Sequence, residues 1–194
     1  MARSFPSFVA RGGTESIPLI GFISQKMECL YVEREARGDK VKGVSAAVKE
    51  RMQHTVSGGT PVHRPMLLFP EGTTSNGEYL LPFKTGAFLA GEPVQPVILK
   101  YGKGRVSPAW DSIKAPRHLF LLLTNVLHSL IAYELPVYVP SSEEQADPAL
   151  YASNVRTYML KYSELKPSTA VLADKREYHA KLLGQTKPAS KKRE

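Results

Sequence analysis

The alternation of short apolar runs with stretches of helical periodicity most constrains the fold of this chain. Five runs suit strands better than helices, at 6–10, 29–34, 65–69, 93–101 and 135–140. Between two of them, residues 39–56 carry valine or methionine at every third or fourth position, which predicts an amphipathic helix. Strands that alternate with helices predict an α/β fold, with helices flanking a mixed, mostly parallel sheet.

Four further helices are predicted, at 15–25, 85–91, 118–133 and 147–164. The last of these has Asp147 as its N-cap and Pro148 at the first helical position, where proline is favoured. The segment 118–133 is strongly apolar, but polar residues interrupt it, and it is shorter than the roughly 20 residues of a membrane span. We expect a buried helix there, one that could touch a membrane interface, and a loose basic tail at 184–194.

An excess of basic residues limits the possible partners. The chain has 26 Lys and Arg against 18 Asp and Glu, a net charge of +8 and a pI of about 9.5. Such a charge favours nucleic acid, a phospholipid surface or a phosphate-bearing substrate, although a merely soluble basic surface would have the same composition. The sequence has no zinc-finger spacing, ribonucleoprotein motif or basic region with heptads, so we expect no nucleic-acid partner.

Cysteine usage and the first residues are compatible with a domain that faces the cytosol. Cys29 is the single cysteine, so no internal disulfide can form. The start MARSFPSFVARGG lacks the apolar core of a signal peptide. No His/Cys cluster or suitably spaced group of acidic residues predicts a metal site.

Residues that could form a binding site lie in or beside three of the predicted strands. Arg34 closes the run 29–34, the residues Glu71, Gly72 and Thr73 follow the run 65–69, and Pro96 lies in the run 93–101. In α/β proteins, groups at the ends of strands tend to meet in one crevice.

The chemistry of these groups suits a phosphorylated ligand that carries hydroxyl groups. Arg34 offers a planar fork to a phosphate, and Lys84 adds a second cation. Glu71 could accept a hydrogen bond from a sugar or glycerol hydroxyl, and Gly72 lets the backbone approach a ligand closely. Ordinary structural explanations remain open: a surface ion pair for Arg34, a simple turn for Glu71 and Gly72, and a solvated Lys84.

One stretch carries a specific resemblance. The sequence FPEGTTSNG at 69–77, followed by LLPFKTGAF and PVQPVILKY, closely resembles the glycerolipid acyltransferase family, in particular its plant-type lysophospholipid (lysophosphatidylethanolamine) acyltransferases. Other segments that look similar to this subfamily are SFPSFVA, IPLIGFIS, SPAWDSI, LPVYVPS, DPALYASNVR and KREYHAKL. The resemblance covers nearly the whole chain. It implies an acyltransferase-like α/β domain at 1–140, a helical extension at 141–183 and a basic tail at 184–194.

The resemblance also implies an activity. It points to acyl transfer from acyl-CoA to a lysophospholipid in phospholipid biosynthesis or remodelling, with acyl-CoA as co-substrate and no other cofactor. It places the protein on the cytosolic face of the endoplasmic reticulum membrane, with the membrane surface as a partner. The final Lys191-Lys192-Arg193-Glu194 is similar to a dilysine retrieval signal, although a basic tail without any signal function would have the same sequence.

Residue roles follow from the same resemblance and cover the polar groups named above. Glu71, Gly72 and Thr73 would contact the acyl acceptor, Arg34 would contact its phosphate with Lys84 nearby, and Pro96 would lie beside the acyl-chain pocket. Thr74 stands where many relatives carry Arg, a replacement that resembles the lysophospholipid-using branch. Glu28 stands where the family usually has Gly.

The family's general base is missing from this sequence. The family uses a His followed, after four intervening residues, by an Asp that orients it. The fifth residues after His54, His63, His118, His128 and His179 are Gly59, Leu68, Leu123, Tyr133 and Gly184. We therefore expect the His-Asp pair upstream of Met1, and a chain that lacks the first part of the domain and is inactive alone. The alternative is a non-catalytic truncated isoform that binds lysophospholipid or membrane.

Overall fold

The computed structural model describes residues 6–32, 46–52, 64–102, 104, 106–110 and 113–184. The chain forms two compact units. The first comprises Met1–Pro70, Lys84–Pro93 and Val139–Ala152, and the second comprises Glu71–Phe83, Val94–Tyr138 and Ser153–Glu194.

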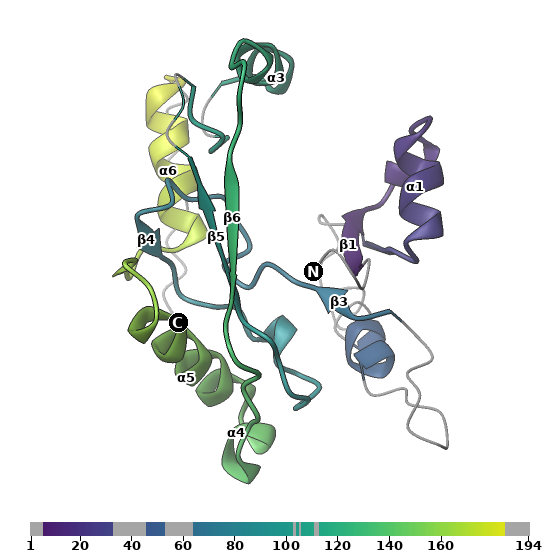
Figure 1. Cartoon of the computed structure of the whole chain (residues 1–194), viewed down its shortest axis with the longest axis vertical. Helices are drawn as coiled ribbons and strands as arrows, with labels where there is room; N and C mark the ends of the chain where they lie inside the picture. Colours follow the sequence, from purple (N-terminus) through teal and green to yellow (C-terminus); the bar gives the residue numbers. More distant parts are fainter. Residues whose placement is uncertain are drawn as a thin grey trace. The chain divides into compact units, whose positions relative to one another are not determined.

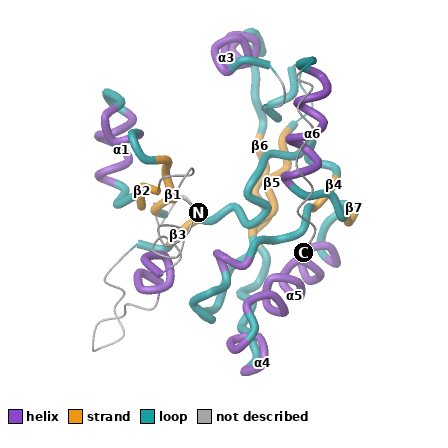
Figure 2. The backbone as a smooth tube through the Cα atoms, turned by 180° about the vertical axis from the view of Figure 1, so that it is seen from behind, coloured by secondary structure: helices purple, strands orange, loops and turns teal. Residues whose placement is uncertain are grey.

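A parallel three-stranded sheet organises the first unit. Strand β1 (Ser7–Arg11) lies between β2 (Leu30–Val32) and β3 (Met66–Leu67), as Figure 2 shows. The connection from β1 to β2 contains the 3-10 turn η1 (Thr14–Ser16) and the helix α1 (Ile20–Lys26). A hydrogen bond of 2.6 Å between the Ser24 and Tyr31 hydroxyls ties α1 to β2.

The remainder of the first unit has its own aromatic core. Residues 46–52 are helical, and η2 (Thr85–Ala87) is a single 3-10 turn. A full capping box at Ser141 begins α4 (Ser142–Ala146). Tyr151 is fully buried, its ring meets that of Phe88 edge to face with the centroids 5.0 Å apart, and its hydroxyl donates to the carbonyl of Glu92.

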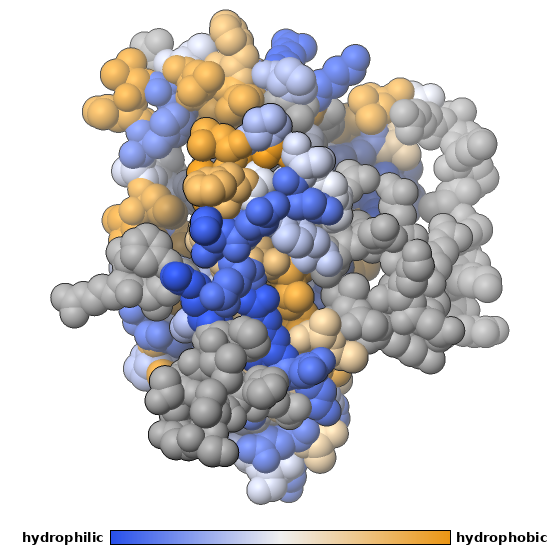
Figure 3. Space-filling view, turned by 90° about the vertical axis from the view of Figure 1, so that its right-hand side faces the viewer, coloured by the Kyte–Doolittle hydropathy of each residue, from blue (hydrophilic) through white to orange (hydrophobic). Residues whose placement is uncertain are grey.

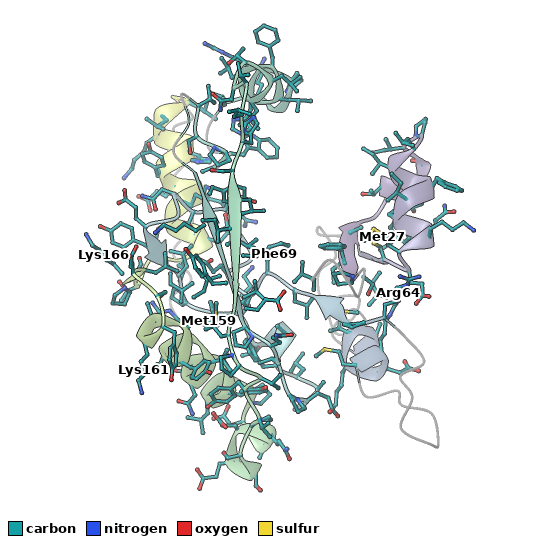
Figure 4. The ribbon with its side chains drawn as sticks, in the orientation of Figure 1. Met27, Arg64, Phe69, Met159, Lys161 and Lys166 are labelled. Atoms are coloured by element: carbon teal, nitrogen blue, oxygen red, sulfur yellow. The ribbon has the colours of Figure 1, made fainter. Side chains whose placement is uncertain are left out.

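The second unit is built on two strand pairs. Strand β5 (Val97–Tyr101) pairs antiparallel with β6 (Leu130–Glu134), as Figure 1 shows, and β4 (Tyr79–Leu80) pairs parallel with β7 (Lys166–Pro167), as Figure 2 shows. Its helices are α3 (Ala115–Leu123), the second half of α5 (Pro148–Lys161) and α6 (Leu172–Leu182). Met159 of α5 is buried, whereas Lys161 and Lys166 point away into solvent (Figure 4).

The α/β class, with parallel and antiparallel pairs, is confirmed. Strands form within 29–34, 65–69 and 93–101, the strand predicted at 6–10 spans Ser7–Arg11, and α5 begins at Pro148 as predicted. Asp147 caps it, since its Oδ1 accepts hydrogen bonds from the N–H groups of Ala149 and Leu150. The helix expected at 15–25 begins only at Ile20, after Pro18. Arg34, most of 39–56 and residues 185–194 lie outside the described residues.

The buried helix predicted at 118–133 is wrong. Helix α3 ends at Leu123, and residues 130–134 form the exposed strand β6. The break has a local cause, because Thr124 Oγ1 donates to the Leu121 carbonyl and Asn125 Nδ2 donates to the Val106 carbonyl. The strand expected at 135–140 is reduced to an isolated bridge between Tyr138 and Val94.

Two features are absent from the residues that the structure describes. None of their helices has the length and hydropathy needed to cross a bilayer. Within the same residues, no three His, Cys, Asp or Glu side chains lie where they could hold a metal ion.

Candidate functional site

The residues 71–74 form a loop that opens the second unit and leads toward β4. Gly72 has φ +66°, a left-handed conformation that favours glycine over residues with a Cβ. Gly72 and Thr74 are exposed, and Thr73 is half-buried. The loop therefore presents a carboxylate, a bare stretch of backbone and two hydroxyl groups within four residues.

Glu71 is the ionisable group of this loop and is half-buried. Its Oε2 accepts a hydrogen bond of 3.0 Å from the N–H of Leu81, which fixes the carboxylate against the end of β4. Burial raises the pKa of Glu71 above its usual 4.5, while the Leu81 hydrogen bond and the positive charge of Arg156 oppose that rise. Glu71 thus has a structural contact as well as a predicted binding role.

Arg156 supports the loop from α5. Its Nη2 donates to the carbonyls of Leu80 and Ser168, both at 2.7 Å, and its Nε donates to the carbonyl of Leu81 at 2.9 Å. Leu80 and Ser168 lie at the adjoining ends of β4 and β7, so the guanidinium joins the two strands where Glu71 is attached. The same group places a positive charge near the Glu71 carboxylate.

Lys175 holds the other end of the loop from α6. Its Nζ donates to the Thr74 carbonyl at 2.9 Å, to Thr74 Oγ1 at 3.0 Å and to the Trp110 carbonyl at 3.5 Å. Thr74 Oγ1 donates in turn to the Trp110 carbonyl at 2.9 Å. One ammonium group thus connects the loop, the segment around Trp110 and α6.

This arrangement suits a ligand with both hydroxyl and phosphate groups. The Glu71 carboxylate can accept a hydroxyl hydrogen bond, and the backbone at Gly72 is open to close approach. Arg156 and Lys175 lend positive charge to either end of the loop, which offsets the carboxylate and favours an anion.

The other predicted site residues lie apart from this loop in the chain. Pro96 is in the same unit, is buried, and directly precedes β5, where its carbonyl accepts a hydrogen bond from the N–H of Leu135. Lys84 belongs to the first unit, where its side chain is exposed and its N–H donates to the Pro70 carbonyl at 2.8 Å. Arg34 lies outside the described residues, and its role stays a prediction.

Sequence reasoning missed Arg156, Lys175 and Trp110. Arg156 lies 75 positions from its partner Leu81, and Lys175 lies 101 positions from its partner Thr74, so no local sequence spacing indicates either contact. The one indication in the sequence was that Arg156 and Lys175 lie in two segments that resemble the acyltransferase family, DPALYASNVR and KREYHAKL.

Comparisons with known proteins agree with the resemblance. A family model described as Acyltransferase matches residues 3–100. Over all of its length the chain is 51% identical to the lysophospholipid acyltransferase LPEAT1 of Arabidopsis thaliana, of which it covers 49%. It is 39% identical to the lysophospholipid acyltransferase LPCAT4 of Xenopus tropicalis (79% of the chain, 29% of that protein). It is 38% identical to human lysophosphatidylcholine acyltransferase 1 (82% of the chain, 29% of that protein).

The chain spans about half the length of the Arabidopsis protein and less than a third of the other two. No solved structure matches it.

Proposed function

The chain belongs to the acyltransferase family, and from that premise we propose that it forms the acceptor-binding part of a lysophospholipid acyltransferase. The observation that carries the proposal is the 51% identity to a lysophospholipid acyltransferase over the whole chain, which includes the loop at 71–74. The chemistry of that loop supports it, because a lysophospholipid offers one free glycerol hydroxyl and one phosphate.

We assign the parts of the acceptor to specific residues. Glu71 accepts a hydrogen bond from the free glycerol hydroxyl, and the backbone at Gly72 and Thr73 lies against the glycerol. Thr74, fixed by Lys175, lies on the phosphate side of the loop. Arg34 and Lys84 add charge to the phosphate, and Pro96 borders the acyl chain.

The proposed reaction uses acyl-CoA as the donor. The acceptor hydroxyl loses its proton to a general base and attacks the thioester carbonyl, and the CoA thiolate leaves and takes up a proton. Lysophosphatidylethanolamine is the proposed acceptor, and the cytosolic face of the endoplasmic reticulum membrane is the proposed place. No cofactor beyond the two substrates takes part.

These 194 residues do not supply the base. No histidine in the sequence is followed by an aspartate at the fifth position. Loss of a general base costs about 10²–10⁴ in rate, so we propose that this polypeptide binds acceptor without turning it over.

Release of CoA thiol tests the proposal, with lysophosphatidylethanolamine as acceptor in detergent micelles. The 194-residue chain is compared with a polypeptide of the same reading frame that carries an upstream His-x₄-Asp. We expect release from the longer polypeptide alone, and a Glu71→Ala change in it to raise the KM for the acceptor. Turnover by the 194 residues would overturn the assignment of the base. A longer form without turnover, but with acceptor binding that Glu71→Ala abolishes, would favour the non-catalytic isoform instead.

A further inference from the structure

Helix α3 exposes three large apolar side chains, whereas Leu121 and Leu122 are half-buried. Leu123 lies four positions after Leu119 and three after Phe120, so it neighbours both on the helix surface, and all three are exposed, Leu123 by 75%. The buried position of the same helix is His118. This is the reverse of an ordinary surface helix, whose apolar stripe faces the core.

The turn after α3 extends this apolar stripe. His128 Nε2 lies 2.9 Å from the Leu122 carbonyl, so the turn folds back onto the last part of the helix. The turn carries Val126 and Leu127, exposed by 95% and 87%, and Leu130 of β6 follows at 52%. Together these residues form what we call the α3 apolar surface: Leu119, Phe120, Leu123, Val126, Leu127 and Leu130. Figure 3 shows apolar side chains gathered at the upper end of the molecule, where α3 lies in Figure 1.

The charged side chains of the segment that carries this surface are basic. Residues 112–133 contain no Asp or Glu, in a chain that has 18 of them. Lys114, the residue just before α3, and Arg117, in its first turn, are both exposed. Exposed leucine and phenylalanine beside exposed lysine and arginine match the boundary between acyl chains and anionic head groups.

We propose that the α3 apolar surface docks the protein onto an anionic phospholipid bilayer. The leucines and Phe120 enter the acyl-chain boundary, and Lys114 and Arg117 contact lipid phosphates. The inference rests on the proposed function, which it deepens by naming the surface through which the protein reaches a substrate that is itself a membrane lipid.

The helix lies on the bilayer instead of crossing it. Helix α3 has nine residues, which gives a length of roughly 14 Å against a hydrocarbon core of about 30 Å. An interfacial position also lets the exposed side chains of the turn enter lipid while the backbone of Thr124 and Asn125 keeps its internal hydrogen bonds.

Vesicle co-sedimentation of the 194-residue chain tests the proposal. Vesicles of phosphatidylcholine with or without phosphatidylserine are used, free of lysophospholipid and acyl-CoA, so that docking is measured without turnover. We expect binding to the mixed vesicles, and Leu123→Ser with Leu127→Ser should weaken it at least about tenfold, because two leucine side chains no longer enter the acyl-chain region. Lys114→Gln and Arg117→Gln should each weaken it about fivefold, and only where phosphatidylserine is present.

A matched control comes from α6. Leu182, the last residue of α6, and Leu183, its C-cap, are also exposed apolar residues, at 53% and 57%, but this helix carries Asp174 and Glu177. The double change of Leu182 and Leu183 to serine should leave vesicle binding unchanged. Circular dichroism of each variant confirms that it folds, which the exposure of the altered residues leads us to expect.

Three outcomes would overturn the proposal. One is no binding to the mixed vesicles, and another is equal loss in the α3 and α6 variants. The third is a dimer in solution that Leu123→Ser with Leu127→Ser dissociates, since the surface would then bind a second copy. None of these bears on CoA release in micelles, so the proposed function fails or stands separately.

Discussion

At the scale of single residues, Glu71 combines a structural contact with a proposed binding role. Burial favours its protonated form, whereas the Leu81 N–H and the Arg156 charge favour the carboxylate. Burial is the largest of the three influences and raises the pKa. The folded protein therefore binds this proton more tightly than the unfolded chain does.

This balance predicts a pH dependence of stability. The contribution of Glu71 to the free energy of unfolding is fully present below pH 4.5, the usual pKa, and is lost as the pH rises through the raised pKa. Glu71→Gln keeps an acceptor for the Leu81 N–H and removes the titration. We expect the stability of the wild type relative to Glu71→Gln to fall across this window, as measured by urea unfolding from about pH 4 to about pH 7. The exposed Glu78→Gln serves as control, and parallel curves for wild type and Glu71→Gln would contradict the prediction.

Glu28 is a residue whose backbone conformation costs free energy. It follows α1 with φ +55°, a left-handed conformation that glycine adopts far more readily. This explains physically why a glycine would be usual at this position. The Glu28 carboxylate forms ion pairs with Arg51 at 3.1 Å and with Arg64 at 3.9 Å.

Two substitutions separate the backbone cost from the ion pairs. Glu28→Gln removes the charge and keeps the Cβ, and since the pairs are partly exposed we expect a loss of about 0–1 kcal/mol. Glu28→Gly also relieves the backbone and should be more stable than Glu28→Gln by about 0.5–1 kcal/mol, after the entropy cost of glycine. Urea unfolding measures the free energy of unfolding of both variants. A lower value for Glu28→Gly than for Glu28→Gln would show that the left-handed conformation costs little here.

At the scale of elements, α6 is tied to the 71–74 loop by one side chain. The three oxygen acceptors of Lys175 belong to Thr74 and Trp110, so α6 and the loop are expected to loosen together. We predict that Lys175→Met lowers stability by about 1–2 kcal/mol and speeds amide hydrogen exchange in both α6 and the loop.

Hydrogen exchange followed by mass spectrometry checks this coupling. Lys175→Arg keeps a charged donor and should restore most of the protection. Lys181→Met, on the exposed side of the same helix where Lys181 pairs with Glu177, should change neither segment. Faster exchange in α6 alone would mean that the loop is held by other contacts.

The sequence was most informative where one local rule dominated. Asp147 and Pro148 predicted the start of α5 because a cap and a first-turn proline act within one helical turn. The segment 118–133 was misjudged because its apolar content favours a helix throughout, whereas the pairing of β6 with β5 depends on residues some thirty positions away. The loop at 71–74 was found by its sequence, but its supports, Arg156 and Lys175, required the three-dimensional structure.

At the scale of the whole molecule, the loop depends on chain that lies beyond the family match. The match to the family model ends at residue 100, yet contacts that hold the loop and its attachment to β4 come from later positions: the Trp110 carbonyl and the side chains of Arg156 and Lys175. The part of the second unit that follows residue 100 therefore supports the proposed acceptor site. The net charge of +8 acts on the same scale, since it favours long-range attraction to the anionic lipid surface that we propose as a partner.

Trp110 gives this loop an intrinsic optical probe. It is the only tryptophan of the chain, its carbonyl accepts from Thr74, and its indole N–H donates to the Ile113 carbonyl at 2.7 Å. All of the tryptophan fluorescence therefore originates beside the 71–74 loop. A titration with unlabelled lysophospholipid can be followed from the emission of this one residue, with no dye attached to the protein.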